Sequence, residues 1–192
     1  GQQQSVKSIV STTTLPAESN ADLQVIRANL KAIEHRDLEI EKGDTFLAKG
    51  DIDTAIACYT AAIRLDPKSI DAFYKRGTSF SLKGNIDREM ADYANILQLD
   101  ATNTATFNRR GMAFANMNAF DRAISNYSEA IRINPSFAEA YNNRALAYAN
   151  QGQIEKSIVD LTQAIKVDSE STNTYFNRAV MFNNSGQFDK AI

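Results

Sequence analysis

Residues 106–135 read TFNRRGMAFANMNAFDRAISNYSEAIRINP, and the spacing of their small and aromatic side chains decides the fold. Gly111 stands three places before Phe114, and this pairing returns every 34 residues along the chain. The aromatic residues are Phe46, Phe80, Phe114, Tyr148 and Phe182, and the small ones are Gly43, Gly77, Gly111, Ala145 and Ala179. A unit this short cannot bury its apolar face alone and must stack on its neighbours. The period therefore predicts a solenoid with a long groove.

Each repeat predicts two helices. In the quoted stretch, apolar residues at spacings of three and four predict a first helix over about 106–117 and a second over about 121–133, ending before Pro135. Asn118 stands at the turn between them. The equivalent turns carry Gly50, Gly84, Gly152 and Gly186. Glycine adopts a left-handed backbone at little cost, so we expect that conformation at these turns.

These columns resemble the tetratricopeptide repeat, whose second helix carries alanine, an aromatic residue and alanine, followed by a closing proline. The first repeat has Ala55, Tyr59, Ala62 and Pro67, and the third has Ala123, Tyr127, Ala130 and Pro135. The resemblance implies an all-α superhelical solenoid of antiparallel helix pairs over residues 36–192. The expected repeats are 36–69, 70–103, 104–137, 138–171 and a partial repeat, 172–192. Glu89, Ile96 and Ala101 depart from the pattern, so we expect looser or shifted packing in the second repeat.

Two segments precede the repeats. Residues 1–20 are rich in Gln, Ser and Thr, which predicts a flexible leader. Residues 21–35 follow Asn20, an expected N-cap, and carry Leu23, Ile26, Leu30 and Ile33 at helical spacing. We expect a helical extension that covers the open face of the first repeat, as solenoid ends require. A short coiled-coil or dimer contact is the alternative.

The chain stops at Ile192, within the second helix of a fifth repeat. The stacking face there predicts either further repeats in a longer protein or coverage by another chain, so a homodimer through an open end remains a second hypothesis.

The composition predicts a soluble protein that does not bind nucleic acid and does not insert into a membrane. The formal net charge is −2, with 43% hydrophobic and 23% charged residues. No apolar run reaches the roughly 18 residues that a membrane-spanning helix needs. The single Cys58 is expected to be a small buried residue. The composition favours a cytoplasmic location and is also compatible with a periplasmic or secreted one.

The sequence contains no recognisable catalytic, metal or cofactor site. His35 is the only histidine and lacks a second ligand at metal-binding spacing. Neither a phosphate-binding glycine loop nor a nucleophile with a nearby base can be assembled. We therefore expect a protein that is not an enzyme and uses no cofactor.

The resemblance implies that the first helix of each repeat lines the concave groove. The implied groove residues are Ile40, Glu41 and Asp44; Tyr74, Lys75 and Leu82; Asn108, Arg109 and Asn116; Asn142, Asn143 and Asn150; and Phe176, Asn177 and Asn184. This groove changes from acidic through basic to neutral amide.

Asparagine recurs in register on three successive first helices, although it costs several tenths of a kcal/mol relative to alanine inside a helix. A side-chain amide both donates and accepts, as a peptide backbone requires. Asn143 and Asn177 also stand in the column where glycosyltransferase superhelices of this repeat family carry an asparagine ladder that holds peptides. The alternative is that repeat duplication copied a tolerated residue.

The resulting prediction is a protein-interaction scaffold that binds an extended peptide or a partner helix. Its expected polar anchors are Asn108, Asn142, Asn143 and Asn177. Lys75 and Arg109 are expected to contact acidic side chains, and Tyr74 and Phe176 apolar ones. The alternatives are a recruitment arm of a longer multidomain enzyme and a self-assembly element.

A second polar column predicts ion pairs inside the repeats. It consists of Arg76, Arg110, Arg144 and Arg178, and the second helices carry a matching column of Asp92, Asn126 and Asp160. We expect each arginine to pair with its partner between the helices, with its stem packed against them. An anion-binding site is the alternative.

Overall fold

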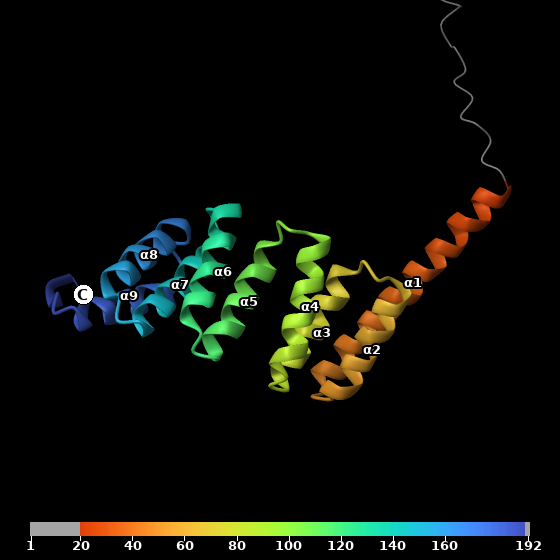
Figure 1. Ribbon diagram of the computed structural model, residues 1–192, viewed down its shortest axis with the longest axis horizontal. Helices are drawn as coiled ribbons and strands as arrows, with labels where there is room; N and C mark the ends of the chain where they lie inside the picture. Colours follow the sequence, from red (N-terminus) through yellow and green to blue (C-terminus); the bar gives the residue numbers. More distant parts are fainter. Residues whose placement is uncertain (1–19, 191–192) are drawn as a thin grey trace, which may run out of the picture.

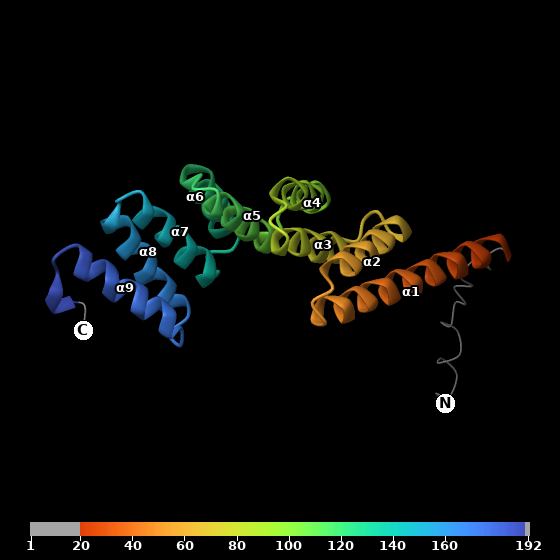
Figure 2. The same cartoon turned by 90° about the horizontal axis from the view of Figure 1, so that it is seen from below.

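The computed structural model describes residues 20–190, which form a row of α-helices joined by short turns (Figure 1). The helices are α1 (Asn20–Ala48), α2 (Ile52–Leu65), α3 (Ile70–Leu82), α4 (Ile86–Leu99), α5 (Thr104–Asn116), α6 (Phe120–Ile133), α7 (Ala138–Asn150), α8 (Ile154–Val167) and α9 (Thr172–Asn184), followed by the 3-10 helix η1 (Phe188–Lys190). These residues contain no strand. The all-α solenoid is confirmed, and Figure 2 shows the row from below. The expected leader and Ile192 lie outside the described residues.

Close contact between the two helices of a repeat depends on the small residue of the first helix. The Tyr127 side chain of α6 is 2% exposed and lies against Gly111 of α5. A Cβ atom at Gly111 would lie 2.5 Å from Cε1 of that ring, so only glycine admits the tyrosine. The fourth repeat has Ala145 and places the smaller, fully buried Leu161 at the equivalent position of its second helix.

The turns between helices have the left-handed backbone that the glycine column predicts. Gly50, Gly84, Gly152 and Gly186 have φ between 69° and 81°. Asn118 adopts the same region with φ 58° and is the one such residue in 20–190 that is not glycine. These turns let α5 and α6, and each equivalent pair, run antiparallel.

The predicted arginine pairs are confirmed in the second, third and fourth repeats. Arg76 donates to Asp92 at 2.7 and 3.0 Å, and Arg144 donates to Asp160 at 2.7 and 2.8 Å. Arg110 donates to the Asn126 amide oxygen at 2.7 Å. The hydrogen bonds to Asp160 raise the pKa of Arg144. Burial lowers the pKa of Arg110, whose amide partner has no compensating charge.

The junction between the second and third repeats, which we call the thin junction, makes the least extensive helix–helix contact of the junctions between described repeats, in line with the looser packing expected for the second repeat. Tyr93 and Ile96 of α4 pack with residues of α2 and α3, and no residue of α5 belongs to their described core cluster. By contrast, the Tyr127 cluster includes Ala147 of the next repeat. Glu89 stands where the first and third repeats bury alanine, and it is only 4% exposed. Burial raises the pKa of the Glu89 carboxyl.

The expected cap over the first repeat is wrong. Residues 21–35 belong to the same continuous helix as the first repeat, α1, and extend past α2 (Figure 1). Leu23, Ile26, Leu30 and Ile33 are 40–55% exposed. No glycine or proline interrupts the chain between Asn20 and Gly43, and the helix runs without a break through this segment. The helix includes Asn20 itself.

Candidate functional site

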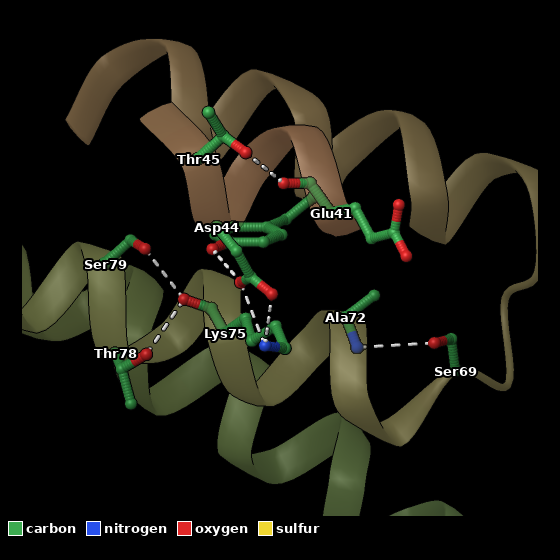
Figure 3. Close-up of polar contacts among 9 residues, drawn as sticks. Glu41, Asp44, Thr45, Ser69, Ala72, Lys75, Thr78 and Ser79 are labelled. Carbon is green, nitrogen blue, oxygen red and sulfur yellow. Dashed lines mark hydrogen bonds and ion pairs between the residues drawn. The ribbon is translucent and has the colours of Figure 1, made fainter. Parts of the chain in front are cut away.

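The first helices α1, α3, α5, α7 and α9 contribute the predicted groove residues, and we call their common surface the first-helix face. At its N-terminal end, Lys75 of α3 contacts both carboxylate oxygens of Asp44 in α1 at 2.9 Å (Figure 3). The Tyr59 hydroxyl also donates to Asp44, at 2.8 Å. The positive charge of Lys75 therefore already has a partner in the neighbouring repeat.

Arg109 and Tyr74 also join two repeats. The Nε atom of Arg109 in α5 donates to the Tyr74 hydroxyl of α3 at 2.9 Å. The guanidinium carbon lies 5.9 Å from the centre of the Tyr74 ring, a distance typical of a cation–π contact. This pair bridges the thin junction between the second and third repeats.

The predicted asparagines bond to one another across the C-terminal repeats. Asn143 of α7 donates to the Asn108 oxygen of α5, and Asn177 of α9 donates to the Asn142 oxygen of α7, each at 3.0 Å. Asn108 also donates to Glu139 at 3.0 Å and is only 2% exposed. Asn108 is therefore a buried support for Asn143, and a ligand cannot reach its amide without rearrangement.

Three of the side-chain amides that are hydrogen-bonded between repeats keep unused hydrogen-bonding capacity. Among residues 20–190, Oδ1 of Asn143, Oδ1 of Asn177 and Nδ2 of Asn142 have no hydrogen-bond partner. All three side chains are half-buried. The other polar group of each amide is hydrogen-bonded to an asparagine of a neighbouring repeat. Two acceptors and one donor are therefore presented in fixed positions.

A hollow of about 300 Å³ lies between α5, α6 and α7, and Asn143 is one of its lining residues. Its lining residues are Met112, Ala115, Asn116, Asn118, Phe120, Tyr127, Asn143, Leu146, Ala147 and Asn150. None of them carries a charge. The predicted groove residues Asn116, Asn143 and Asn150 thus meet at one place, together with an apolar surface.

The predicted apolar contacts differ in accessibility. Phe176 of α9 is 68% exposed and can contact a ligand directly. Tyr74 is half-buried and engaged by Arg109. Sequence reasoning missed Met112, Phe120 and Leu146, because their neighbourhood depends on how two repeats pack. One signal was present in the sequence, since Asn118 breaks the glycine column at the turn beside them.

The described residues contain no candidate metal site. No group of three or more His, Cys, Asp or Glu side chains in 20–190 is arranged to hold a metal ion. His35 is exposed on α1, and Cys58 is buried as expected. Among the helices of this part of the chain, none combines the length and the hydropathy that crossing a bilayer requires.

Family models match most of the repeat region. A model described as TPR repeat matches residues 43–84 and 111–152, and one described as tetratricopeptide repeat matches residues 138–171. Together these matches span more than half of the chain. The comparison with curated proteins finds no match.

Several solved structures share the fold. A crystal structure of MamA is 25% identical with a TM-score of 0.69, covering 78% of this chain and 87% of MamA. PilF of Pseudomonas aeruginosa is 18% identical with a TM-score of 0.75, covering 84% of this chain and 73% of PilF. YrrB, described as a TPR protein with an unusual peptide-binding site, is 20% identical with a TM-score of 0.63, covering 86% and 87% of the two chains.

Proposed function

Because the chain belongs to the tetratricopeptide repeat family of protein-interaction scaffolds, we propose that the C-terminal half of its first-helix face binds an extended peptide. The unused amide groups of Asn142, Asn143 and Asn177 carry this proposal. An extended backbone presents N–H and C=O groups regularly along its length, and side-chain amides can pair with both. The peptide-binding site named for YrrB is consistent with such a ligand.

The N-terminal half of the face has a secondary role in this proposal. Asp44 already pairs with the charge of Lys75, which weakens the attraction of Lys75 for an acidic ligand. Arg109 uses Nε on the Tyr74 hydroxyl and can offer its other N–H groups to a ligand. Each new hydrogen bond contributes about 0.5–1.5 kcal/mol net, and ordering a flexible peptide offsets part of this gain. We therefore expect weak binding that depends on several contacts acting together.

A displayed library of random, unstructured peptides tests the proposal. The native chain is used for selection, and the enriched peptides are then measured against an Asn143→Ala, Asn177→Ala variant. An Asn95→Ala, Gln98→Ala variant is the matched control, because both amides lie on the second helix α4, outside the first-helix face, and lack described partners. Asn95 is half-buried, as Asn143 and Asn177 are, and Gln98 is exposed.

All three proteins must show the same helical circular dichroism before their affinities are compared. Loss of binding in the Asn143→Ala, Asn177→Ala variant alone supports the amide site. Equal binding by both variants refutes it.

The exposed stripe of α1 supports a second candidate function, self-association. Leu23, Ile26, Leu30 and Ile33 follow the 3-4-3 spacing of a coiled-coil seam. Farther along the same seam, Ile40 packs in the core with Ala72 of α3 and Asp44 binds Lys75. A parallel partner helix following the seam would meet α3. An antiparallel partner avoids this obstacle and places Leu23 on Ile33, and Ile26 on Leu30, of the second copy.

Sedimentation equilibrium of the native chain and of a Leu30→Glu variant tests this candidate. Val25→Glu is the matched control, because Val25 is 59% exposed on the same segment but lies off the stripe. A native dimer that dissociates only in Leu30→Glu supports antiparallel pairing. A native monomer at every concentration refutes it.

A further inference from the structure

The hollow between α5, α6 and α7 combines an apolar interior with an amide rim. Met112, Phe120 and Leu146 supply apolar surface, and Leu146 is 37% exposed. Because the lining contains no charged side chain, a charged group entering the hollow would lose water without gaining an ionic partner there. An apolar side chain has no such cost and gains by leaving water. The volume of about 300 Å³ can accommodate a single large side chain.

Asn118 distinguishes this hollow from the corresponding places in the other repeats. It lines the hollow while its backbone stands at φ 58°, where four equivalent turns have glycine. Asparagine tolerates this conformation less well than glycine does. Within residues 20–190, its side-chain amide has no hydrogen-bond partner that would compensate. The strained position therefore presents a free donor and a free acceptor at the rim.

We infer that this hollow receives one uncharged apolar side chain of the bound peptide, and that Asn118 hydrogen-bonds the peptide backbone beside it. The inference rests on the proposed peptide binding and specifies which peptides bind. Asn143 also lines the hollow, so the backbone anchor and the side-chain pocket are adjacent. An extended peptide can then bond to Asn143 through its backbone while one of its side chains enters the hollow, because the neighbouring side chains point to the opposite side. The ligand class is an extended segment with an aliphatic or aromatic anchor residue.

Selection from the same displayed library measures the anchor preference. We expect the native chain to enrich peptides with an aliphatic or aromatic residue at one fixed position. Leu146→Lys places a charge at the hollow and should weaken the selected peptides at least about tenfold, because apolar burial is lost. The matched control is Leu99→Lys, since Leu99 lies on the second helix α4, outside the first-helix face and the hollow, and is 40% exposed. This control should bind as the native chain does.

Asn118→Gly separates the ligand contact from folding. Glycine suits the left-handed turn better, so the variant should be at least as stable as the native chain to urea. Its affinity for the selected peptides should nevertheless fall about three- to tenfold, the value of one hydrogen bond. Unchanged affinity would show that the Asn118 side chain does not bond to the peptide.

The outcomes distinguish the inference from the function on which it rests. If the native chain enriches no peptide, the proposed function fails and the inference fails with it. If peptides are enriched and depend on Asn143 and Asn177 but show no apolar anchor, the groove stands and the assignment of the hollow is wrong. Equal binding by Leu146→Lys and Leu99→Lys overturns the assignment in the same way. An apolar anchor lost only in Leu146→Lys supports it.

Discussion

Replacing Arg144 by alanine should destabilise the fourth repeat strongly, because the change leaves a buried carboxylate without its partner. Nε and Nη2 of Arg144 donate to the two oxygens of Asp160 at 2.7 and 2.8 Å. Nη1 also donates to Ser128 of the preceding repeat, at 2.9 Å. The Asp160 side chain is 7% exposed, so little water is available to replace these bonds.

Breaking a buried ion pair from one side costs about 3–5 kcal/mol. The Arg144 side chain is 18% exposed, so we expect the lower end of this range, about 3 kcal/mol, for Arg144→Ala. Asp160→Asn instead recreates the arrangement of the third repeat, where Arg110 bonds to Asn126. That change keeps an acceptor for the arginine, and we expect a loss of only about 1 kcal/mol.

Urea unfolding followed by circular dichroism gives the free energies, and hydrogen exchange locates the loss. Because a solenoid is stabilised by contacts between neighbours, exchange should accelerate first in α7 and α8. Arg144→Met is the control for packing, since it keeps most of the apolar stem and removes only the guanidinium, which lies over the Tyr141 and Tyr148 rings. Native-like stability of Arg144→Met, or equal losses for Arg144→Ala and Asp160→Asn, would refute the argument from the stranded carboxylate.

Three further predictions concern the packing of the helix pairs. Gly111→Ala should cost about 1–3 kcal/mol through overpacking against Tyr127, and adding Tyr127→Leu should recover part of this loss; strictly additive losses in urea unfolding would contradict the steric explanation. Glu89→Gln should raise the melting temperature more at about pH 7 than at about pH 4, because a raised pKa in the folded state makes native stability fall as pH rises and Glu89 ionises; a difference independent of pH would argue against this reasoning. Ser157→Ala should gain about 1 kcal/mol, because the buried Ser157 hydroxyl has no hydrogen-bond partner within the described part of the chain; a lower urea midpoint would show that this hydroxyl is satisfied.

The residue columns in the sequence predicted part of the candidate site. The pattern identified Asn142, Asn143 and Asn177 as a polar set on one face, and the structure brings each of them into hydrogen bonds between repeats. The pattern could not show that Asn108 is buried, because burial depends on how closely α5 and α7 approach. It also could not show that Lys75 is neutralised by Asp44, since that contact depends on the stagger between α1 and α3.

The N-terminal segment shows the same limit. Helical periodicity in residues 21–35 correctly predicted a helix, but periodicity says nothing about the direction in which that helix leaves the array. The expected cap is instead a straight continuation of α1 that leaves Leu30 55% exposed. A sequence can specify an apolar stripe without specifying what covers it.

By itself, the sequence determined the helix pairs, their turns and the arginine pairing, because each depends on side chains at fixed positions within one repeat or its copy. Gly111 and Tyr127, for example, meet because the small residue of the first helix lies opposite the large residue of the second helix in the same repeat. Only the tertiary structure decided which groups of the asparagine amides remain free and where the hollow lies. These features depend on the spacing and rotation between successive repeats, which add up along the solenoid from many small packing contacts.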